Sequence, residues 1–478
     1  MARLGTTGRA AATYVLLAGL QRGISLFMLP FITHAMSTVE YGAASMLSAA
    51  SVLITALMAG PLIPLVVRAT ARGEEDGPVV LRTIGTYCYL VLPIAVALVS
   101  GGVALFVPEM LGVKGAIWAI ELLAIGLQPA ASTFALWVAR AREDMPRFVW
   151  ISSISVAVTA ISKLVLVVVL QLGVLGWVMS DLISAVIAAV LAVCLVRLPR
   201  ARLSSRCLRY AVNFTLPLIP HSASLWALNS LSRPAMAAVS SLEQVGLLSF
   251  GLTLSAVAGL ILLEINAALL PHYSREIFPA PTGETAAAVK WQLILAFLVP
   301  ATVGCGVAIA GRWLFAEAYW PSFFLTGVML LGQAAYGLYY LPMNFLTQTA
   351  GLPKYSAAVS APGAVVILLG VLLVGHRHGA VGVSYVTAAG YLTMAASALL
   401  ITRIQRLAIV WRSWLPLWPA VGLAAASLAC SVAALASPLG STVQWTLTGT
   451  SLLLTAVAVV SAAHWNASVG SKVGGEDI

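Results

Sequence analysis

Five charged side chains lie deep inside long apolar stretches of this sequence. They are Arg22, Lys163, Asp181, Arg233 and Glu264. Placing such a charge at the centre of a bilayer-spanning helix costs about 2.5–3.5 kcal/mol. A charge retained there is expected to have either a function or a structural partner, so these residues are the first candidates for chemistry.

The two arginines are candidate anion ligands. Arg22 follows Gln21 within the first apolar stretch, and Arg233 precedes Pro234. A guanidinium group binds phosphate in a bidentate manner and stays charged at any relevant pH. The alternative for Arg22 is a packing pair with a neighbouring helix. The alternative for Arg233 is that its side chain extends to the outer lipid headgroups.

His221 and Asn229 are eight residues apart, which places them on roughly the same face of a helix. Both side chains can hydrogen-bond the hydroxyl groups of a ligand, and His221 can also titrate near neutral pH. A histidine whose bonds are satisfied inside the helix packing is the competing interpretation.

The acidic residues suggest ion coupling. Glu264 lies deep in the run Leu262–Asn266 and is expected to carry a proton, bind a cation or pair with an arginine. Lys163 and Asp181 are expected to form a buried pair, with each serving a cavity as the alternative. Glu121 lies near the end of its apolar stretch and is expected to face water.

The elements that hold these residues must be transmembrane helices. The chain has 478 residues, of which 60% are hydrophobic and only 9% charged, whereas soluble domains carry about 25% charged residues. A helical span needs about 20 apolar residues, and an isolated strand cannot cross a bilayer. The sequence predicts an all-α polytopic membrane protein with spans at 11–34, 41–67, 83–107, 116–139, 148–171, 174–196, 212–236, 242–270, 289–311, 320–347, 354–375, 379–402, 414–436 and 443–464.

Lys and Arg are distributed unequally between the two sets of alternate loops. Of the 26, one set carries 20, the other carries Lys114, Arg312 and Arg377, and three lie inside spans. The positive-inside rule therefore predicts a multi-pass membrane protein with both termini in the cytoplasm. The segment from Arg197 to Arg209, with five arginines and no acid, is expected to lie along the inner leaflet.

The sequence lacks the motifs of several other classes of function. The five cysteines are scattered, without CxxC or a His/Cys cluster, so neither a disulfide framework nor a metal site is expected. We expect no cofactor, no nucleic-acid partner and no enzymatic activity, because phosphate-binding loops and nucleophile motifs are missing from the sequence. No cleavage site follows the first apolar run, so we expect it to remain as the first helix.

The two halves of the chain repeat each other. Pro30, Gly42 and Ser45 recur as Pro234, Gly246 and Ser249, each 204 residues later, and the string Pro146–Phe148 recurs as Pro353–Tyr355. An offset of six helices gives a parallel repeat. The predicted organisation is an N-terminal six-helix lobe (1–197), a basic linker (198–211), a C-terminal six-helix lobe (212–402) and two extra helices with a short tail (403–478).

With these features the sequence resembles the multidrug/oligosaccharidyl-lipid/polysaccharide (MOP) exporter superfamily. The stretches Leu29–Phe31 and Glu40–Gly42 are similar to the first hairpin of its polysaccharide flippase branch, and Leu216–His221 with Asn229–Arg233 is similar to that branch's seventh span. Members often have Asp where Ser232 stands. The extra helix pair favours this Wzx-like branch over the drug exporters.

The resemblance implies a MATE-like fold of two pseudo-symmetric lobes that transports by alternating access. The implied substrate is a polyprenyl-diphosphate-linked oligosaccharide, moved to the outer leaflet for cell-surface polysaccharide biosynthesis. Implied partners are this lipid-linked glycan, membrane lipids and the glycan polymerase and glycosyltransferases of the same pathway. On this hypothesis Arg22, Lys163, His221, Asn229, Arg233 and Glu264 bind substrate, and Glu264 and Asp181 are candidates for ion coupling.

Two other functions remain open. One is a drug or cation antiporter of the same fold, which would need an acidic rather than a cationic cavity. The other is a membrane-embedded glycosyltransferase or ligase, which needs a large extracytoplasmic loop that the sequence lacks. Tyr336, Tyr339 and Tyr340 either stack on sugars or pack in the core.

Overall fold

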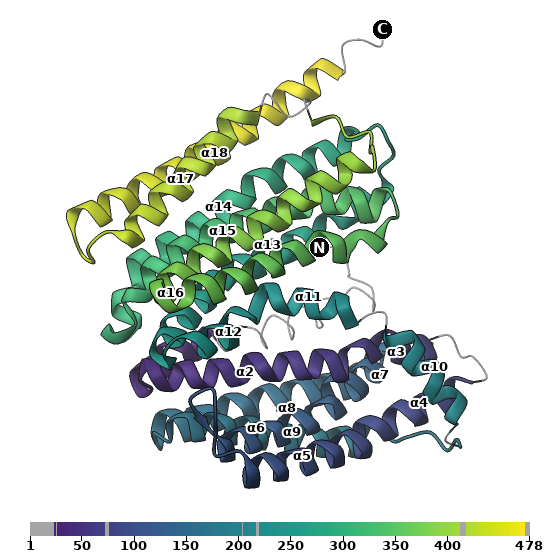
Figure 1. Ribbon diagram of the computed structural model, residues 1–478. Helices are drawn as coiled ribbons and strands as arrows, with labels where there is room; N and C mark the ends of the chain where they lie inside the picture. The colour runs from purple at the N-terminus through teal and green to yellow at the C-terminus, as the bar shows by residue number, and fades with distance from the viewer. Residues whose placement is uncertain are drawn as a thin grey trace. The chain divides into compact units, whose positions relative to one another are not determined.

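The computed structural model describes residues 23–24, 26–71, 76–202, 204–216, 219–411 and 417–473, except the side chains at 205, 208, 220–222, 225, 283–284 and 465–473. The chain divides into two compact units, Met1–Trp226 (unit 1) and Ala227–Ile478 (unit 2). Each unit is a bundle of long helices that lie roughly side by side and run across the view in Figure 1.

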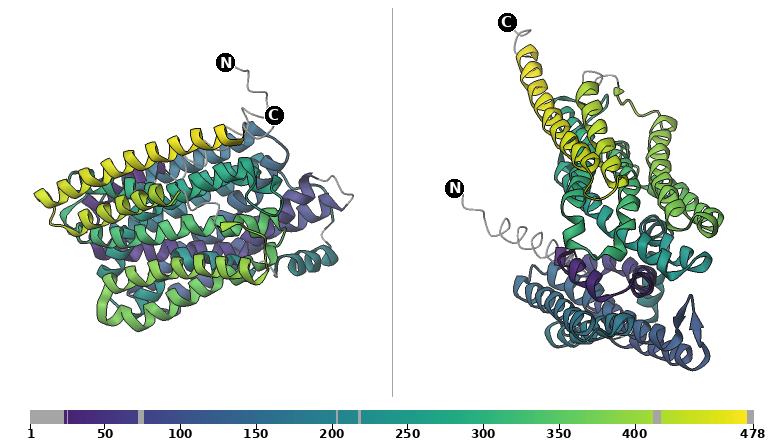
Figure 2. Two further views of the ribbon diagram at one scale, coloured as in Figure 1. Left: turned by 90° about the horizontal axis from the view of Figure 1, so that it is seen from above. Right: turned by 90° about the vertical axis from the view of Figure 1, so that its left-hand side faces the viewer.

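Unit 1 begins with the short helix Leu26–Ala35. Its further elements are α2 (Thr38–Met58), η1 (Gly60–Leu62), α3 (Ile63–Ala71), α4 (Gly77–Thr86), η2 (Tyr87–Val91), α5 (Leu92–Phe106), β1 (Glu109–Met110), β2 (Val113–Lys114), α6 (Gly115–Pro129), η3 (Ala130–Ala135), α7 (Leu136–Ala141), α8 (Met145–Lys163), η4 (Leu164–Val169), α9 (Gly173–Leu195) and α10 (Ser205–Thr215). The β1–β2 pair is a small antiparallel hairpin, visible at the right of the second view in Figure 2.

Helix α11 (Ile219–Ser230) crosses the division between the units, and its residues from Ala227 onward belong to unit 2. Unit 2 continues with α12 (Ser232–Val239), α13 (Leu242–Arg275), α14 (Gly283–Leu314), η6 (Glu317–Tyr319), α15 (Pro321–Asn344), η7 (Phe345–Thr349), η8 (Pro353–Tyr355), α16 (Ser356–Ile404), α17 (Trp418–Ala436) and α18 (Thr442–Val473). The last two helices pack against each other and against α14.

The expected number of spans is confirmed. Eleven helices in the described chain are long and apolar enough to cross a membrane. One of these, Pro353–Ile404, contains two spans, because Gly379 breaks it with φ 54° and ψ −144°. The short helix Leu26–Ala35 and the pair α11–α12 correspond to the first and seventh expected spans. The chain is therefore an all-α, multi-pass membrane protein of about fourteen spans.

Prolines lie where several helices of the structure change their pitch. Pro61 lies in the 3₁₀ turn η1, which separates α2 from α3 within one span. Pro129 ends α6, and the next six residues form a π-helical segment, η3. Pro342 lies in the last turn of α15, just before the π-helical η7. A proline removes one backbone donor, so the helix adjusts its pitch or bends at these points.

The predicted repeat is visible at two helix starts. Ser37 caps α2: its Oγ accepts a hydrogen bond from Glu40 N (3.3 Å), and Glu40 Oε2 accepts one from Ser37 N (2.9 Å). Ser241, 204 residues later, caps α13 and accepts from Gln244 N (3.4 Å). Equivalent spans thus begin with the same cap in both units.

The side chain three residues after each capping serine, Glu40 or Gln244, also contacts a glycine with positive φ. Gly173, with φ +55°, lies against the Glu40 carboxylate at the start of α9. Gly379, with φ +54°, lies against the Gln244 amide, and Ala380 N donates to Gln244 Oε1 (2.9 Å). A Cβ at either glycine would collide with the capping side chain. We call these two pairs, Glu40–Gly173 and Gln244–Gly379, the cap–glycine clamps.

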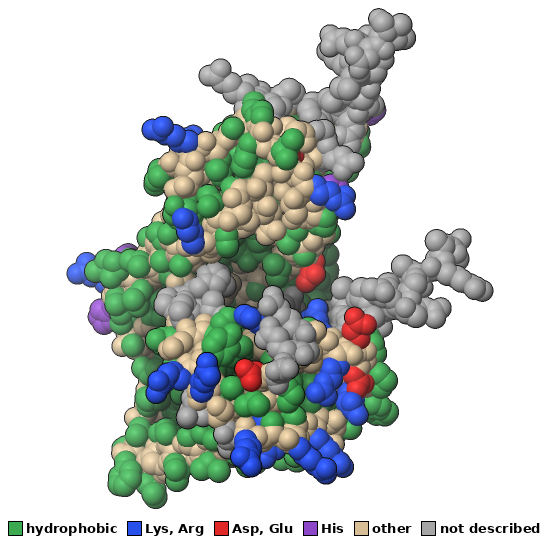
Figure 3. Space-filling view, turned by 90° about the vertical axis from the view of Figure 1, so that its right-hand side faces the viewer, with side chains coloured by type: hydrophobic (Ala, Val, Ile, Leu, Met, Phe, Trp, Pro, Cys, Tyr) green, Lys and Arg blue, Asp and Glu red, His purple; other side chains and the backbone are tan. Residues whose placement is uncertain are grey.

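The two ends of unit 1 differ in charge. In its described part, one end carries Arg68, Arg82, Arg140, Arg142, Arg147, Arg197, Arg200, Arg202, Arg206 and Arg209, and the opposite end carries Lys114. We call the first the arginine-rich end. Figure 3 views it, and Lys and Arg side chains gather on the lower part of that face. Helix α10 overlaps the basic linker expected at 198–211. It exposes Arg206 and Arg209 and buries Ala211.

Candidate functional site

The interior of unit 1 contains an ion pair between α8 and α9. Lys163 Nζ at the end of α8 lies 3.0 Å from Asp181 Oδ1 on α9, with the two side chains 14% and 23% exposed. The pair that the sequence suggested is confirmed. In such surroundings a cation and a carboxylate attract each other more strongly than at a wet surface.

Glu121 on α6 joins this pair, and here the sequence-based expectation was wrong. Rather than facing water, Glu121 is only 2% exposed and interacts electrostatically with Asp181 and Lys163. Its Oε2 has no hydrogen-bond partner among the described residues. The position of Glu121 near the end of its apolar stretch suggested exposure. The expectation failed because a sequence does not reveal which face of α6 turns toward α9.

An aromatic side chain holds the lysine from another side. Lys163 Nζ lies 3.8 Å from the centre of the Trp177 ring, and Trp177 Nε1 donates to Ser48 Oγ (3.1 Å). Tyr41 meets the same ring edge-on, with the centroids 6.3 Å apart. Helices α2, α6, α8 and α9 thus position one cation between two carboxyl groups and an indole face. This arrangement, the unit 1 charge cluster, consists of Glu121, Lys163, Asp181 and Trp177.

Unit 2 contains a cluster of tyrosines on α15 and α16. The Tyr336 ring lies parallel to Tyr339 (5.9 Å between centroids) and tilts against Tyr340 (4.8 Å) and Tyr391 (5.6 Å). Tyr336 and Tyr339 are half-buried, and Tyr340 and Tyr391 are buried. Tyr340 OH has no hydrogen-bond partner in the described part of the chain.

Two of the predicted site residues border this tyrosine cluster. Tyr391 OH donates to Asn229 Oδ1 on α11 (3.1 Å). Arg233 on α12 is half-buried and close enough to interact electrostatically with Tyr391. Asn229 and Arg233 are therefore brought together with aromatic rings, which the spacing of residues along the sequence did not indicate.

Of the remaining predicted site residues, the structure describes the side chain of Glu264 but not those of His221 and Arg22. Glu264 lies on α13 with an exposed side chain. His221 belongs to α11, but its side chain is not among those described. Arg22 lies outside the described residues.

A buried polar network that the sequence did not indicate begins two residues beyond Glu264, at Asn266. Asn266 Oδ1 accepts from Gln292 Nε2 (2.9 Å) and from Asn344 Nδ2 (2.8 Å), and Gln292 Oε1 accepts from Tyr273 OH (2.5 Å). These four residues join α13, α14 and α15. Single uncharged amides do not stand out in a hydropathy profile, so the network was not predicted. Once buried, each amide needs hydrogen-bond partners.

Lys290 is one of the 20 cations that the sequence assigned to the more basic set of loops. That assignment was wrong, because on α14 Lys290 is completely buried, and its Nζ donates to the carbonyl of Ala462 on α18 (2.9 Å). The Trp291 ring lies 4.9 Å from the same ammonium group. Lys290 therefore links α14 to α18 within unit 2.

Long apolar helices arranged in this way, with polar clusters inside each unit, define a polytopic membrane fold. No family model matches the sequence, and no curated protein sequence matches it significantly. The structure is similar to that of the lipid II flippase MurJ in an inward closed conformation: the TM-score is 0.70 at 10% identity, over 96% of this chain and 99% of that chain.

A second solved structure has a related shape. An inward-facing multidrug resistance MATE family transporter of the MOP superfamily matches with a TM-score of 0.63 at 12% identity, over 81% of this chain and 94% of that chain. The MOP-type fold expected from the sequence is therefore confirmed. At these identities the likeness concerns the fold.

Proposed function

We propose that this protein is a flippase that moves a polyprenyl-diphosphate-linked oligosaccharide from the cytoplasmic to the outer leaflet by alternating access. The observation that carries the proposal is the extent of the structural match. The flippase structure matches 96% of the chain, whereas the multidrug transporter matches 81%. A match over 96% of the chain must include most of α17 and α18.

The chemistry of unit 2 supports the same proposal. An oligosaccharide presents hydroxyl groups and apolar ring faces, and its diphosphate presents negative charge. The tyrosine cluster offers rings and hydroxyl groups, Asn229 an amide and Arg233 a guanidinium group. Aromatic rings with a polar tip suit a ligand that is apolar on one face and hydrogen-bonding at its edge. Arg22 is proposed as the second cation for the diphosphate, with His221 and Lys163 as further ligands.

Location and partners follow from this proposal. The protein would lie in a bacterial inner membrane with both termini in the cytoplasm, and would act between the glycosyltransferases that build the glycan and the polymerase that extends it. Glu264 and Asp181 are the proposed ion-coupling residues. Glu121, which shares the unit 1 charge cluster with Asp181, now joins them.

The test is a leaflet-accessibility assay in proteoliposomes that contain a polyprenyl-diphosphate-linked oligosaccharide. The expected result is that wild-type protein makes the inner-leaflet substrate accessible to an added glycosidase. Arg22→Ala is expected to reduce this rate at least tenfold, the loss of about 1.4 kcal/mol, while the protein still inserts.

Two variants are the controls. Arg22→Lys keeps the charge but not the bidentate geometry, and should retain part of the rate. Arg209→Ala removes an exposed arginine of α10 and should leave the rate unchanged. Wild-type protein that leaves the glycolipid where it was would refute the proposal. A normal rate for Arg22→Ala would refute the role of Arg22.

The alternative is a drug or cation antiporter, and the unit 1 charge cluster is the observation in its favour. Two carboxyl groups share one lysine there, which suits exchange of a cation or proton. Proteoliposomes with an imposed proton or sodium gradient would then accumulate a fluorescent organic cation, and Glu121→Gln would abolish that uptake. Uptake without glycolipid movement would favour this second function.

A further inference from the structure

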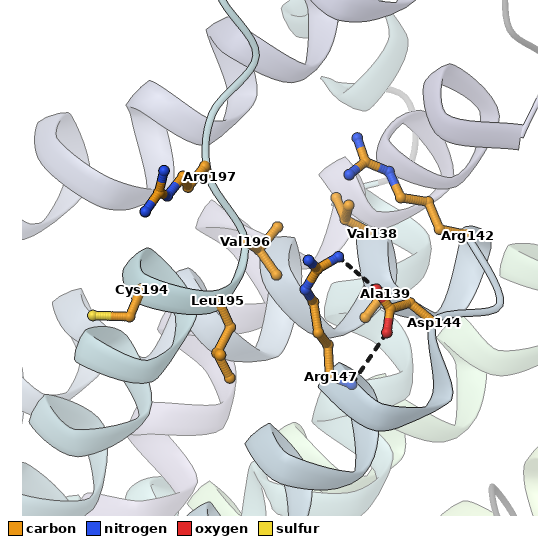
Figure 4. A pocket seen from close by; sticks show the side chains of 9 residues that line it. All are labelled: Val138, Ala139, Arg142, Asp144, Arg147, Cys194, Leu195, Val196 and Arg197. Atoms are coloured by element: carbon orange, nitrogen blue, oxygen red, sulfur yellow. Dashed lines mark hydrogen bonds and ion pairs between the residues drawn. The ribbon is translucent and has the colours of Figure 1, made fainter.

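A cavity of about 410 Å³ lies at the arginine-rich end of unit 1, apart from both clusters described above. Three helix ends meet there: the C-terminus of α7, the N-terminus of α8 and the C-terminus of α9. Its lining comprises Val138, Ala139, Arg142, Asp144, Arg147, Cys194, Leu195, Val196 and Arg197 (Figure 4). Pockets for small ligands have volumes of about 300–1,000 Å³, so this one has room for a headgroup.

The charge of the lining is positive. The lining includes three arginines, Arg142, Arg147 and Arg197, and a single carboxylate, that of Asp144. Asp144 Oδ2 accepts a hydrogen bond from Arg147 Nη1 (2.5 Å), and its Oδ1 accepts one from Arg147 N (3.3 Å). No ion pair joins Arg142 or Arg197 to a described carboxylate. Two guanidinium groups of the pocket are thus left for an anion to neutralise.

The pocket lies at the level where lipid headgroups meet water. The three apolar spans that form it end or begin at Ala141, Met145 and Leu195. Val138, Ala139, Leu195 and Val196 supply its apolar lining, and its charged residues lie within the first turn of α8 or next to the helix ends. Basic pockets between transmembrane helices at this depth bind phosphate-containing headgroups.

Helix electrostatics account for part of this arrangement but not all of it. Arg142 and Arg197 follow the C-termini of α7 and α9, where a positive charge is favoured by about 0.3–1 kcal/mol. Arg147 is different, because it stands in the first turn of α8, where a positive charge is disfavoured and Asp144 compensates it. Three arginines at three different helix ends line this one cavity. Such a set suits an anion with several oxygen atoms better than it suits three independent helix caps.

We infer that this pocket binds a phosphate group, through Arg142 and Arg197 together with the outer edge of the Arg147 guanidinium. Arginine binds phosphate through paired N–H groups, which gives both charge and geometry. The phosphate belongs either to the headgroup of an anionic phospholipid in the adjacent leaflet or to a free phosphate compound. The inference does not depend on what the protein transports.

The experiment uses the full-length protein in nanodiscs of phosphatidylcholine with or without phosphatidylglycerol. Native mass spectrometry measures retained phosphatidylglycerol, and titration calorimetry measures binding of inorganic pyrophosphate. Wild-type protein is expected to bind at least one of them. The double variant Arg142→Gln/Arg197→Gln is expected to bind it at least tenfold more weakly, the loss of about 1.4 kcal/mol.

A charge variant of opposite sign sharpens the test. Asp144→Asn keeps a side-chain acceptor for the cap of α8 but removes the carboxylate that repels an anion, so affinity should rise about threefold. Arg209→Gln, on exposed α10 at the same end, is the matched control and should change neither measurement.

The two arms separate the sources of the phosphate. Retention of phosphatidylglycerol without pyrophosphate binding identifies a lipid headgroup, and pyrophosphate binding that displaces lipid identifies a soluble phosphate. Either result supports the inference. Equal binding by wild type, the double variant and Asp144→Asn would overturn it. If the double variant does not fold, Arg142→Gln alone and Asp144→Asn still predict affinity changes of opposite sign.

Discussion

At the scale of the residue, the unit 1 charge cluster is held by a balance of charges. Lys163 lies between Asp181, 3.0 Å away, and the buried Glu121, and its ammonium group also faces the Trp177 ring. Removing one partner of a buried ion pair usually costs more than removing both, because the remaining charge stays buried and uncompensated.

This balance predicts the outcome of a double-mutant cycle. Lys163→Met should destabilise the protein by about 3–5 kcal/mol, because two carboxyl groups then face each other without a cation. Adding Asp181→Asn should restore much of that loss. The measurement is the midpoint of thermal unfolding in detergent. Lys114→Met, at an exposed site on β2, is the control and should shift stability by no more than about 0.5 kcal/mol.

Additive losses in this cycle would contradict the coupling. The sequence did predict the Lys163–Asp181 pair, because two opposite charges in neighbouring spans have few other partners. It did not predict that Glu121 joins them or that Lys290 is buried. Both depend on the rotation of one helix about its axis, which a continuously apolar stretch leaves undefined.

At the scale of the element, the cap–glycine clamps fix where equivalent helices begin. Gly379 has φ 54° and ψ −144°, a conformation that is almost confined to glycine, and the Gln244 amide occupies the space where a Cβ would stand. The repeated serines, glycines and prolines were visible in the sequence. The glycines at 173 and 379 were not recognised as part of the repeat, because their role depends on a partner more than 130 residues away.

Substituting the clamp glycine should therefore be costly. Gly379→Ala is expected to destabilise the protein by about 1–3 kcal/mol through its backbone conformation, with the steric clash added. Gly306→Ala is the matched control: it lies within α14 with no atom within 4 Å of the added Cβ, so it should be neutral or stabilising by up to about 1 kcal/mol. Equal effects of the two substitutions on the thermal midpoint would rule out a special role for Gly379.

A second element-scale feature is the connection after α13, which a single carboxylate organises. Glu276 Oε1 accepts from Thr282 Oγ1 (2.8 Å) and Ile277 N (3.1 Å), and Oε2 accepts from Thr282 N (3.0 Å). Burial by itself raises the pKa of Glu276, but hydrogen bonds from Thr285, Thr282 and the backbone outweigh it, so its pKa lies below the ordinary value.

The sign of this shift predicts a pH dependence. A carboxylate with a lowered pKa in the folded state stabilises the protein above its unfolded-state pKa of about 4.3, and the contribution is lost as the pH falls through the folded-state pKa. Glu276→Gln should therefore lower the unfolding temperature at pH 7. The difference from wild type should shrink below about pH 4. A difference that stays constant down to pH 3 would show that the charge is unimportant.

At the scale of the whole molecule, the unequal charge of the two ends of unit 1 predicts its orientation. The arginine-rich end should face the cytoplasm, and the β1–β2 hairpin the outside. Cysteines introduced at Glu143 and Glu109, in a variant without native cysteines, provide the test, because both positions are exposed. A membrane-impermeant maleimide should label Glu109→Cys in intact cells and Glu143→Cys only after permeabilisation. The opposite pattern would reverse the orientation.

Most of the overall architecture could be predicted from the sequence, because hydrophobic length and charge distribution act on whole helices. The break at Gly379 and the start of α13 at Leu242 lie where the apolar stretches were divided. The tyrosine cluster and its neighbours Asn229 and Arg233 could not be predicted as a group. They come from four helices, α11, α12, α15 and α16, whose mutual packing leaves no periodic signal in any one of them.

The π-helical segments have a consequence for how the chain tolerates change in length. A π turn accommodates one additional residue, and one residue turns an α-helix by about 100°. Deleting a residue from η3 would therefore let that span become regular α-helix with little rotation of α7 relative to α6, and Val138 and Ala139 would stay in the wall of the arginine pocket. Deleting a residue of α7 before Val138 would instead turn both side chains away from the pocket. Because η7 follows α15 within one span, unit 2 is expected to show the same tolerance of a single-residue deletion at its π-helical segment.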